Sequence, residues 1–375
     1  MHASWVEIAP DIIANNLIAA REYLAPHTRF CAVLKADAYG HGIDIVLPAL
    51  MQNGVDFIGI TSNNEAGRAR ACGYTGRIMR LRTAVFEEAA AGLDFGIEEL
   101  VASVETAHHL SALGRISGRP MPVHLSINAG GMGRDGLELS STTDQQACLR
   151  ILQDNGLRIA GLMTHFPSNL PDDLIVSRKL FQSQVDWVFN QSGLKRDQVI
   201  IHAGSSLTLM AGGTQEYDMV RCGAVLYGIV GPRTQFQEAM ALKSRVTSIN
   251  HCPKGANVGY DHAHQLTRNS RLASVSIGYA NGYRRLMANC GNVVIRGVVA
   301  PILGKISMNA LVVDVTDIPD VRAGDTVVLF GDKLDPLKVE HQSQTILADL
   351  YVDWGRANAR QIVGPNRREH RRGRT

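Results

Sequence analysis

This 375-residue chain lacks the sequence features that mark several special protein classes. Its six cysteines never occur in C-x-x-C spacing, so we expect neither a disulfide framework nor a zinc or other metal site. No segment approaches the roughly 18 consecutive apolar residues of a membrane span, and no apolar core opens the chain as in a signal sequence. These absences predict a cytoplasmic protein without a membrane partner.

Length and charge indicate how many domains the chain has and which partners its charge favours. A chain of 375 residues exceeds one ordinary core and predicts about two domains, while 45% hydrophobic and 19% charged residues are typical of globular proteins. The net charge of +3 neither favours nor excludes an acidic partner. Basic residues are concentrated in residues 366–375, which we interpret as a solvated, disordered tail rather than a nucleic-acid site.

Residues 11–232 alternate apolar runs with helical patterns. About eight such strand-then-helix units predict an α/β fold, a (β/α)8 TIM-type barrel. A doubly wound sheet remains the alternative, since strand order cannot be read from the sequence. The strand-like runs are Phe30–Leu34, Val55–Ile60, Ile78–Leu81, Leu100–Val104, Val123–Ile127, Ile159–Thr164, Val199–His202 and Met219–Tyr227.

The pattern of apolar and polar residues changes after Pro232. Short alternating segments, such as Leu272–Ile277 and Thr326–Phe330, are separated by Gly, Asn, Asp and Pro. This pattern predicts a predominantly β C-terminal domain over residues 233–365, with one late helix near residues 344–353. Residues 1–10 contain a strand-like segment that we expect to pair with this second domain.

Lys35 directly follows the buried run Phe30–Leu34 and precedes a glycine-rich turn. Barrel enzymes place their chemistry at the carboxyl ends of strands. Partial desolvation there favours a neutral amine that can attack a carbonyl group. Tyr39 and the amides after it can reach an anion such as a phosphate. An ordinary lysine at a strand end is the alternative interpretation.

The segment Ala32–Gly42 resembles the pyridoxal-phosphate lysine motif of alanine racemases and their broad-specificity relatives, and further matches recur along nearly the whole chain. The resemblance implies a cofactor, pyridoxal 5′-phosphate, bound through Lys35 and contacted by Tyr39. It also implies that His165 packs against the pyridine ring and that Ser206 binds the phosphate.

Arg221 lies inside the apolar run Met219–Tyr227, and a buried arginine must be paired. In the racemases the matching arginine hydrogen-bonds the pyridine nitrogen, which leaves that nitrogen unprotonated and restricts side reactions. By the same resemblance, the backbone amides of Gly223 and Ala224 contact the phosphate, because glycine permits close approach.

Four matches supply substrate chemistry, three of them in the second domain. Tyr260 lies in a segment that resembles the family's catalytic-tyrosine motif, and Tyr279 lies in one that resembles its substrate-cavity motif. Met308 matches a residue whose backbone amide holds the substrate carboxylate. Arg134, which ends a glycine-rich loop, matches an arginine beside the cofactor's phenolic oxygen and that carboxylate. The family implies a head-to-tail homodimer with composite sites.

The mechanism that the resemblance implies is inversion of an amino acid at Cα by two bases. Lys35 serves one face of the carbon and Tyr260 of the partner subunit serves the other. A free tyrosine has a pKa of about 10, which suits a base poorly near neutral pH. We therefore expect cationic His165 and Arg221 to favour the phenolate.

The chain also departs from the alanine-specific pattern. Seven positions before Arg134, where the family often has a carbamylated lysine, stands Ile127, so Arg134 is oriented through Asn128 or a bound anion. Arg356 aligns near a tyrosine that lines the phosphate and the pocket. It either binds the phosphate or faces the substrate and disfavours cationic side chains, and we assign it to the phosphate. The segments Asn128–Met132 and Val258–Asp261 resemble the broad-specificity branch more closely, which implies a racemase of broad specificity that includes alanine.

Three alternative functions remain open from the sequence. They are a strict alanine racemase, a pyridoxal-phosphate-dependent decarboxylase of basic amino acids, and a non-catalytic pyridoxal-phosphate carrier. The second domain argues against the carrier, and Arg221 argues against the decarboxylase, which uses an acidic partner for the ring nitrogen.

Overall fold

The computed structural model describes residues 2–214, 216–331 and 333–364. The chain divides into two compact units. One, here the barrel unit, comprises Ala14–Ala38 and Val46–Phe236, and the other, here the β unit, comprises Met1–Ile13, Tyr39–Ile45 and Gln237–Thr375. The basic segment 366–375 lies outside the described residues. Within them, no helix has both the length and the apolar character that crossing a membrane requires.

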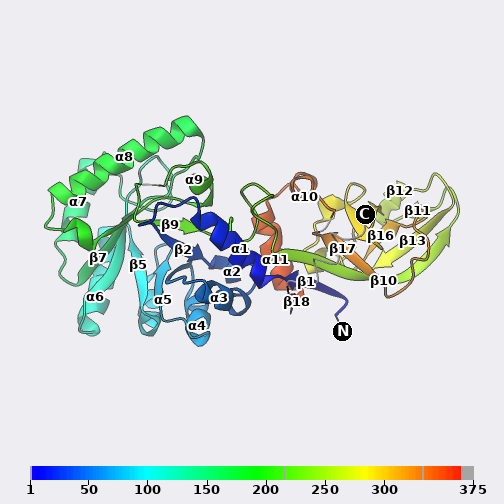
Figure 1. The fold of residues 1–375 in the computed structure, drawn as a ribbon, viewed down its shortest axis with the longest axis horizontal. Coiled ribbons are helices and arrows are strands. Elements are labelled where there is room, and N and C mark those ends of the chain that lie inside the picture. The colour runs from blue at the N-terminus through cyan, green and yellow to red at the C-terminus, as the bar shows by residue number, and fades with distance from the viewer. Residues whose placement is uncertain (1, 215, 332, 365–375) are drawn as a thin grey trace. The chain divides into compact units, whose positions relative to one another are not determined.

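Eight parallel strands close into a barrel in the barrel unit (Figure 1). The predicted TIM-type barrel is confirmed, and the doubly wound sheet is excluded because β2 pairs with both β3 and β9. The strands are β2 (Arg29–Val33), β3 (Phe57–Ile60), β4 (Arg77–Arg80), β5 (Ile97–Val101), β6 (Met121–Ser126), β7 (Leu157–Met163), β8 (Ile200–His202) and β9 (Met219–Cys222).

Helices follow the strands in the expected alternation. Polar caps define several helix starts: the Ser103 hydroxyl accepts a hydrogen bond from the Thr106 amide at the start of α6. The helices in this part of the chain are α1 (Pro10–Arg21), α3 (Ile43–Gln52), α4 (Asn63–Ala71), α5 (Phe86–Ala91), α6 (Val104–Ile116), α7 (Thr142–Leu152), α8 (Pro171–Asn190) and α9 (Ser206–Met210).

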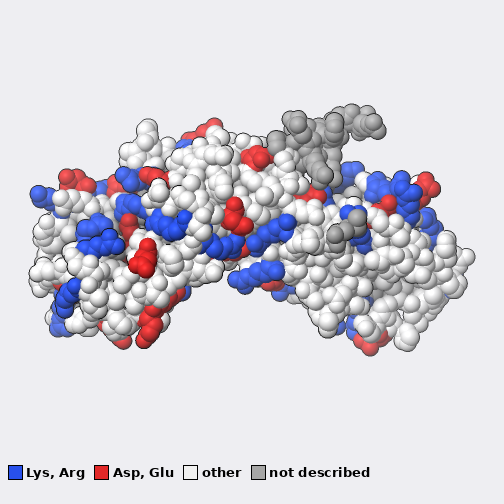
Figure 2. All heavy atoms as spheres, turned by 90° about the horizontal axis from the view of Figure 1, so that it is seen from below, with Lys and Arg blue, Asp and Glu red and all other residues white. Residues whose placement is uncertain are grey.

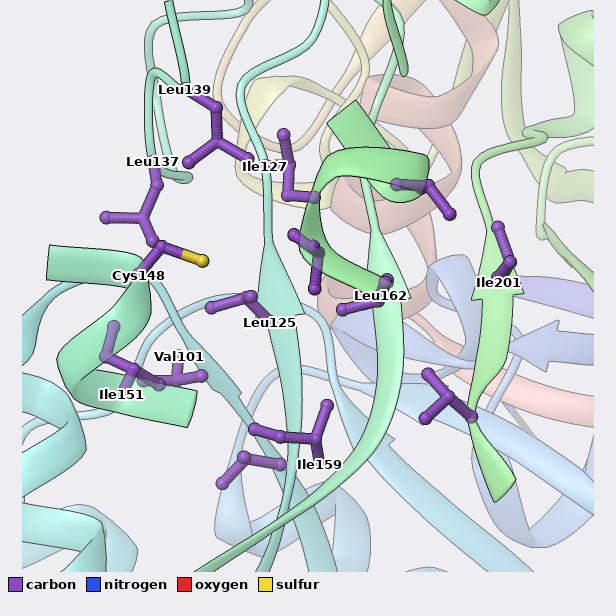
Figure 3. Close-up of a cluster of buried hydrophobic side chains, with 14 of the residues drawn as sticks. Val101, Leu125, Ile127, Leu137, Leu139, Cys148, Ile151, Ile159, Leu162 and Ile201 are labelled. Atoms are coloured by element: carbon purple, nitrogen blue, oxygen red, sulfur yellow. The ribbon is translucent and has the colours of Figure 1, made fainter. Parts of the chain in front are cut away.

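Alternation along the strands separates two layers of the barrel core. Outward side chains such as Leu125 and Leu162 pack against Cys148 and Ile151 of α7 (Figure 3). A second, smaller apolar cluster contains Cys31, Phe57, Met79, Leu100, Met163 and Met219, which come from six different barrel strands. Because successive residues of a strand face opposite sides, Val101 and Leu162 belong to the first cluster, while their neighbours Leu100 and Met163 belong to the second.

The β unit is predominantly β, as predicted. Strand β1 (Ser4–Ile8) pairs antiparallel with the long β10 (Met240–Cys252) and parallel with β18 (Ala359–Ile362). Strand β13 pairs with both β10 and β16, which closes the sheet on itself. The remaining strands are β11 (Asn257–Val258), β12 (His264–Gln265), β13 (Ser270–Val275), β14 (Asn292–Ile295), β15 (Val298–Leu303), β16 (Leu311–Asp314) and β17 (Thr326–Phe330).

Two helices, α10 (Pro336–Ser343) and α11 (Leu347–Ala357), complete the β unit. Trp354 and Tyr351 of α11 are fully buried against Phe330 of β17. On the face shown in Figure 2, Lys and Arg side chains are interspersed with Asp and Glu among uncharged residues.

Candidate active site

Lys35 stands at the carboxyl end of β2 and opens an unusual turn. The next four residues, Ala36, Asp37, Ala38 and Tyr39, have φ values of 54°, 57°, 56° and 53°, so they form a left-handed turn without glycine. The sequence predicted a glycine-rich turn here, yet glycine enters only at Gly40. Left-handed conformation costs about 1–2 kcal/mol for each such residue. Backbone strain of this kind concentrates at functional sites.

Glu65 in the first turn of α4 holds the left-handed turn in place. Its buried carboxylate accepts hydrogen bonds from the amides of Thr61 (2.7 Å), Ser62 (3.1 Å) and Asp37 (3.3 Å). The Asp37 carboxylate in turn pairs with Arg68 at 2.5 Å. The sequence analysis missed Glu65, although the capping-box spacing Ser62-x-x-Glu65 marks it.

Lys35 lies among positive charges. Desolvation lowers the pKa of its amine, and the positive charges of Arg134 and Arg221 lower it further, whereas Glu65 opposes the shift. The side chain is exposed at the strand end, so water screens part of these effects. The pKa of Lys35 is therefore lowered, which is the direction that the sequence predicted.

Arg221 is buried among neutral partners. Its guanidinium donates to Nδ1 of His202 and to the carbonyl of Thr164, both at 2.8 Å, and lies 3.4 Å from Nδ1 of His165. Burial lowers the pKa of Arg221 to about 10, which leaves it cationic at neutral pH. Within the described residues, no carboxylate contacts this guanidinium directly.

His165 is neutral, which corrects the expectation of a cationic histidine. Its burial, together with the positive charges of Arg221, Arg134 and Lys35, lowers its pKa to about 3. The sequence placed the histidine at a strand end correctly but could not show how many cations surround it. The fixed positive charges near this histidine are therefore the arginines.

Arg134 ends a loop that Asn128 organises. The Asn128 Oδ1 accepts a hydrogen bond from the Gly133 amide at 3.1 Å, and the Arg134 Nε pairs with Asp135 at 3.2 Å. Asn128, Arg134 and Asp135 line a small pocket together with Ser126, Thr164 and His165. Ile127 belongs to the outer apolar cluster, labelled in Figure 3.

Ser206, Gly223 and Ala224 lie close together just beyond β9. The predicted run Met219–Tyr227 ends as a strand at Cys222, and the chain then turns. The Ser206 hydroxyl accepts a hydrogen bond from the Val225 amide at 3.3 Å. No hydrogen bond from the amides of Gly223 or Ala224 to another described residue exists. Two such adjacent amides suit an anion.

The β unit brings Tyr260, Tyr279 and Met308 to one segment. The Tyr279 amide donates to Ser307, and the Ala280 amide donates to the Met308 carbonyl at 2.9 Å. A Cβ atom at Gly259 would lie 2.6 Å from the Lys305 amide nitrogen, so the loop of Tyr260 also packs on residues 304–308. The side chains of Tyr260, Tyr279 and Met308 are 67%, 42% and 55% exposed.

Tyr39 and Arg356 also belong to the β unit. Arg356 is exposed in the last turn of α11. Next to it, Gly355 packs so closely on Gly40 that a Cβ atom at position 355 would lie 1.9 Å from the Gly40 carbonyl oxygen. This contact fixes the backbone that follows the left-handed turn.

Known proteins match the chain along nearly its whole length. Residues 8–230 match the family model of the alanine racemase N-terminal domain, and residues 239–362 match that of the C-terminal domain. A broad specificity amino-acid racemase of Pseudomonas putida is 40% identical over 365 residues, which cover 96% of this chain and 89% of that protein. A lysine racemase of Proteus mirabilis is 35% identical with the same coverages.

Solved structures agree with the sequence matches. An alanine racemase of Clostridium difficile superimposes with a TM-score of 0.89 at 26% identity and covers 98% of this chain and 97% of its own. One from Bartonella henselae, with covalently bound pyridoxal phosphate, has a TM-score of 0.85 at 25% identity and coverages of 97% and 100%. The predicted resemblance, the fold and the assignment to racemases, and hence to isomerases, are confirmed. The chain belongs to the alanine racemase family.

Proposed function

We propose that this chain is a pyridoxal-phosphate-dependent racemase that inverts several amino acids, including alanine, at Cα. The observation that carries the proposal is the cluster of Lys35, Arg134, His165 and Arg221 at the carboxyl ends of the barrel strands. Relatives named broad specificity and lysine racemases support substrates larger than alanine.

The residues present fit the cofactor. Lys35 supplies an amine with a lowered pKa, the unpartnered amides of Gly223 and Ala224 suit a phosphate, and Arg221 supplies N–H donors for a ring nitrogen. We assign Tyr39, Ser206 and Arg356 to the phosphate group and His165 to the ring, in keeping with the family. When bound, pyridoxal phosphate withdraws electrons from the substrate and acidifies its Cα–H bond.

Proton transfer needs a base on each face of Cα. Lys35 serves one face, since its amine is held at the strand end and its lowered pKa favours the form that accepts a proton. Tyr260 serves the other face and Arg221, rather than His165, supplies the positive charge that favours a phenolate. Arg134, Tyr279 and the Met308 amide orient the substrate, with its carboxylate on the arginine fork.

We propose that two chains form a head-to-tail homodimer with composite sites. Tyr260, Tyr279 and Met308 share one end of the β unit, and all three expose large side chains to solvent. A partner chain would cover these side chains. A cytoplasmic location stays a prediction.

A chiral assay tests the proposed function. The protein is incubated with pyridoxal phosphate and with each common L-amino acid in turn, and the enantiomers are separated by chromatography. We expect D-products from alanine and from a larger substrate such as lysine. Turnover of alanine alone would contradict the broad specificity, and release of carbon dioxide would favour a decarboxylase instead.

A further inference from the structure

A line of hydrogen-bonded side chains crosses the interior of the barrel. The Arg221 guanidinium reaches His202 Nδ1 at 2.8 Å, His202 Nε2 reaches His124 Nδ1 at 2.8 Å, and His124 Nε2 reaches the Glu98 carboxylate at 2.8 Å. Arg77 completes the line with two bonds to Glu98 of 2.5 and 2.7 Å. These five residues, from five strands, are here called the barrel relay.

The two ends of the barrel relay determine the direction of every hydrogen bond in it. Arg221 can only donate, so His202 accepts at Nδ1 and carries its proton on Nε2. His202 then donates to Nδ1 of His124, which carries its own proton on Nε2 and donates to Glu98. An ionised Glu98 can only accept, so the same tautomers follow from the other end.

The charges in the barrel relay agree with this direction. Burial raises the pKa of the Glu98 carboxyl, but the hydrogen bonds from His124 and Arg77 outweigh it and lower the pKa to about 2. Burial lowers the pKa of His124, against the effect of Glu98, and lowers that of His202 far more strongly. Both histidines are therefore neutral between a cation and an anion.

The surrounding backbone makes room for the barrel relay. A Cβ atom at Gly161 of β7 would lie 2.2 Å from Nδ1 of His124, so only glycine fits beside that ring. His124 and His202 are completely buried, and Glu98 is 6% exposed. A polar network in a barrel interior is costly to bury unless every member is paired, and apolar side chains would fill the same space at lower cost.

We propose that Glu98, acting through His124 and His202, is a positioning residue for Arg221. The ionised carboxylate of Glu98 fixes the tautomers of His124 and His202. In these tautomers His202 can only accept at Nδ1, so one N–H group of Arg221 donates to it. The guanidinium is thereby held in one orientation at the site, beside His165. This inference rests on the proposed function, in which the remaining donors of Arg221 serve the cofactor ring.

Nuclear magnetic resonance of the apoprotein tests the direction of the relay without any turnover. Long-range proton–nitrogen correlations of 15N-histidine-labelled protein identify which ring nitrogen carries the proton, with variants at positions 124 and 202 for assignment. We expect both histidines as neutral Nε2–H tautomers that do not titrate between about pH 5 and pH 8. An Nδ1–H tautomer or a titration in that range would overturn the proposal.

Glu98→Gln tests the positioning role, with Glu99→Gln as the matched control. Glu99 neighbours Glu98 on β5, is also buried and pairs with Arg80 instead. In Glu98→Gln the new amide oxygen accepts the hydrogen bonds of Arg77, so the amide NH2 faces His124. His124 must then accept at Nε2 and carry its proton on Nδ1, and His202 must change its tautomer in the same way. The Nδ1–H group of His202 would then face an N–H group of Arg221, so that two donors oppose each other. We expect altered histidine tautomers and a loss of roughly 10–100-fold in kcat and in the affinity of the apoprotein for pyridoxal phosphate.

The control separates this role from stability. Glu99→Gln is expected to lower the thermal midpoint while it leaves the tautomers, the cofactor affinity and kcat unchanged. His124→Gln can still donate to Glu98 and accept from His202, so it should retain more activity than His124→Leu. Equal losses in these paired variants would refute the proposal. A wild-type protein without racemase activity would refute the proposed function but leave the tautomer and cofactor-affinity results interpretable.

Discussion

The backbone amide of Asp37 donates a hydrogen bond to Glu65 at 3.3 Å, which ties the left-handed turn after Lys35 to the first turn of α4. The same carboxylate also accepts from the amides of Thr61 and Ser62. One buried side chain therefore stabilises both the helix start and the strained turn.

Replacement of Glu65 by alanine is expected to destabilise the protein and to reduce racemase activity. The change leaves several amide donors without an acceptor, and an orphaned buried group costs about 1–3 kcal/mol. The thermal midpoint, followed by calorimetry, should fall, and kcat should fall with it because the turn relaxes. Glu87→Ala, an exposed glutamate in the first turn of α5, serves as the control and should change neither quantity. A Glu65→Ala protein with unchanged thermal midpoint and kcat would show that the left-handed turn is stable without the hydrogen bonds of Glu65.

Mixing two inactive variants tests the composite site. Lys35→Ala and Tyr260→Phe are each expected to lose racemisation, because each removes one of the two bases. In a head-to-tail dimer, a mixed pair of chains has one site with both bases intact. After unfolding and refolding together in equal amounts, about a quarter of the wild-type activity per site should return.

The control for this experiment is each variant refolded alone, which should stay inactive. A mixture without activity, despite mixed dimers detected by a size tag on one variant, would mean that the two bases come from one chain. Full activity of Tyr260→Phe alone would refute the assignment of the second base.

The sequence predicted those strands whose positions follow from a local pattern of apolar residues. Each barrel strand overlaps an apolar run, since most side chains of a buried parallel strand are apolar. One strand that escaped prediction lacks this signal: β18 (Ala359–Ile362) reads Ala-Arg-Gln-Ile. It pairs with β1 (Ser4–Ile8), which lies far away in the sequence.

The sequence predicted which residue types form the site, but it did not predict all of their protonation states. Lys35 and Arg221 stand out because they end or interrupt apolar runs, whereas Arg134 was assigned from its match to the family's loop arginine. The neutral state of His165 was not predicted, because it depends on burial and on three cations that come from separate segments of the chain. The left-handed turn was also missed, since its stabilising acceptor, Glu65, lies 28 residues from Asp37.

Acid is expected to destabilise the protein through His165. An unfolded histidine has a pKa of about 6.5, whereas burial and nearby cations lower the pKa of folded His165 to about 3. Between these values the unfolded chain binds the extra proton, so stability falls as the pH falls from about 6.5 and is fully present above it. The loss from this group is at most about 1.4 kcal/mol for each pH unit.

His165→Gln removes this titrating group. Its thermal midpoint should therefore fall less between pH 7 and pH 5 than that of the wild type, as measured by calorimetry in matched buffers. His124 and His202 add to the acid sensitivity of both proteins in the same direction, because their pKa values are also lowered. Equal falls in the two proteins would mean that His165 is protonated in the folded state.

Gly355→Ala is expected to disrupt the β unit where α11 meets Gly40. The new Cβ atom would lie 1.9 Å from the Gly40 carbonyl oxygen and 2.5 Å from its carbon, and neither backbone group can rotate away as a side chain would. Overpacking of this kind costs about 1–3 kcal/mol or more. The displaced Gly40 also continues the turn that begins at Lys35, so cofactor affinity should fall together with the thermal midpoint. Gly364→Ala is the matched control, because a Cβ atom there meets nothing within 4 Å. If both alanine variants melt at the wild-type temperature, the close packing of Gly355 on Gly40 does not exist in solution.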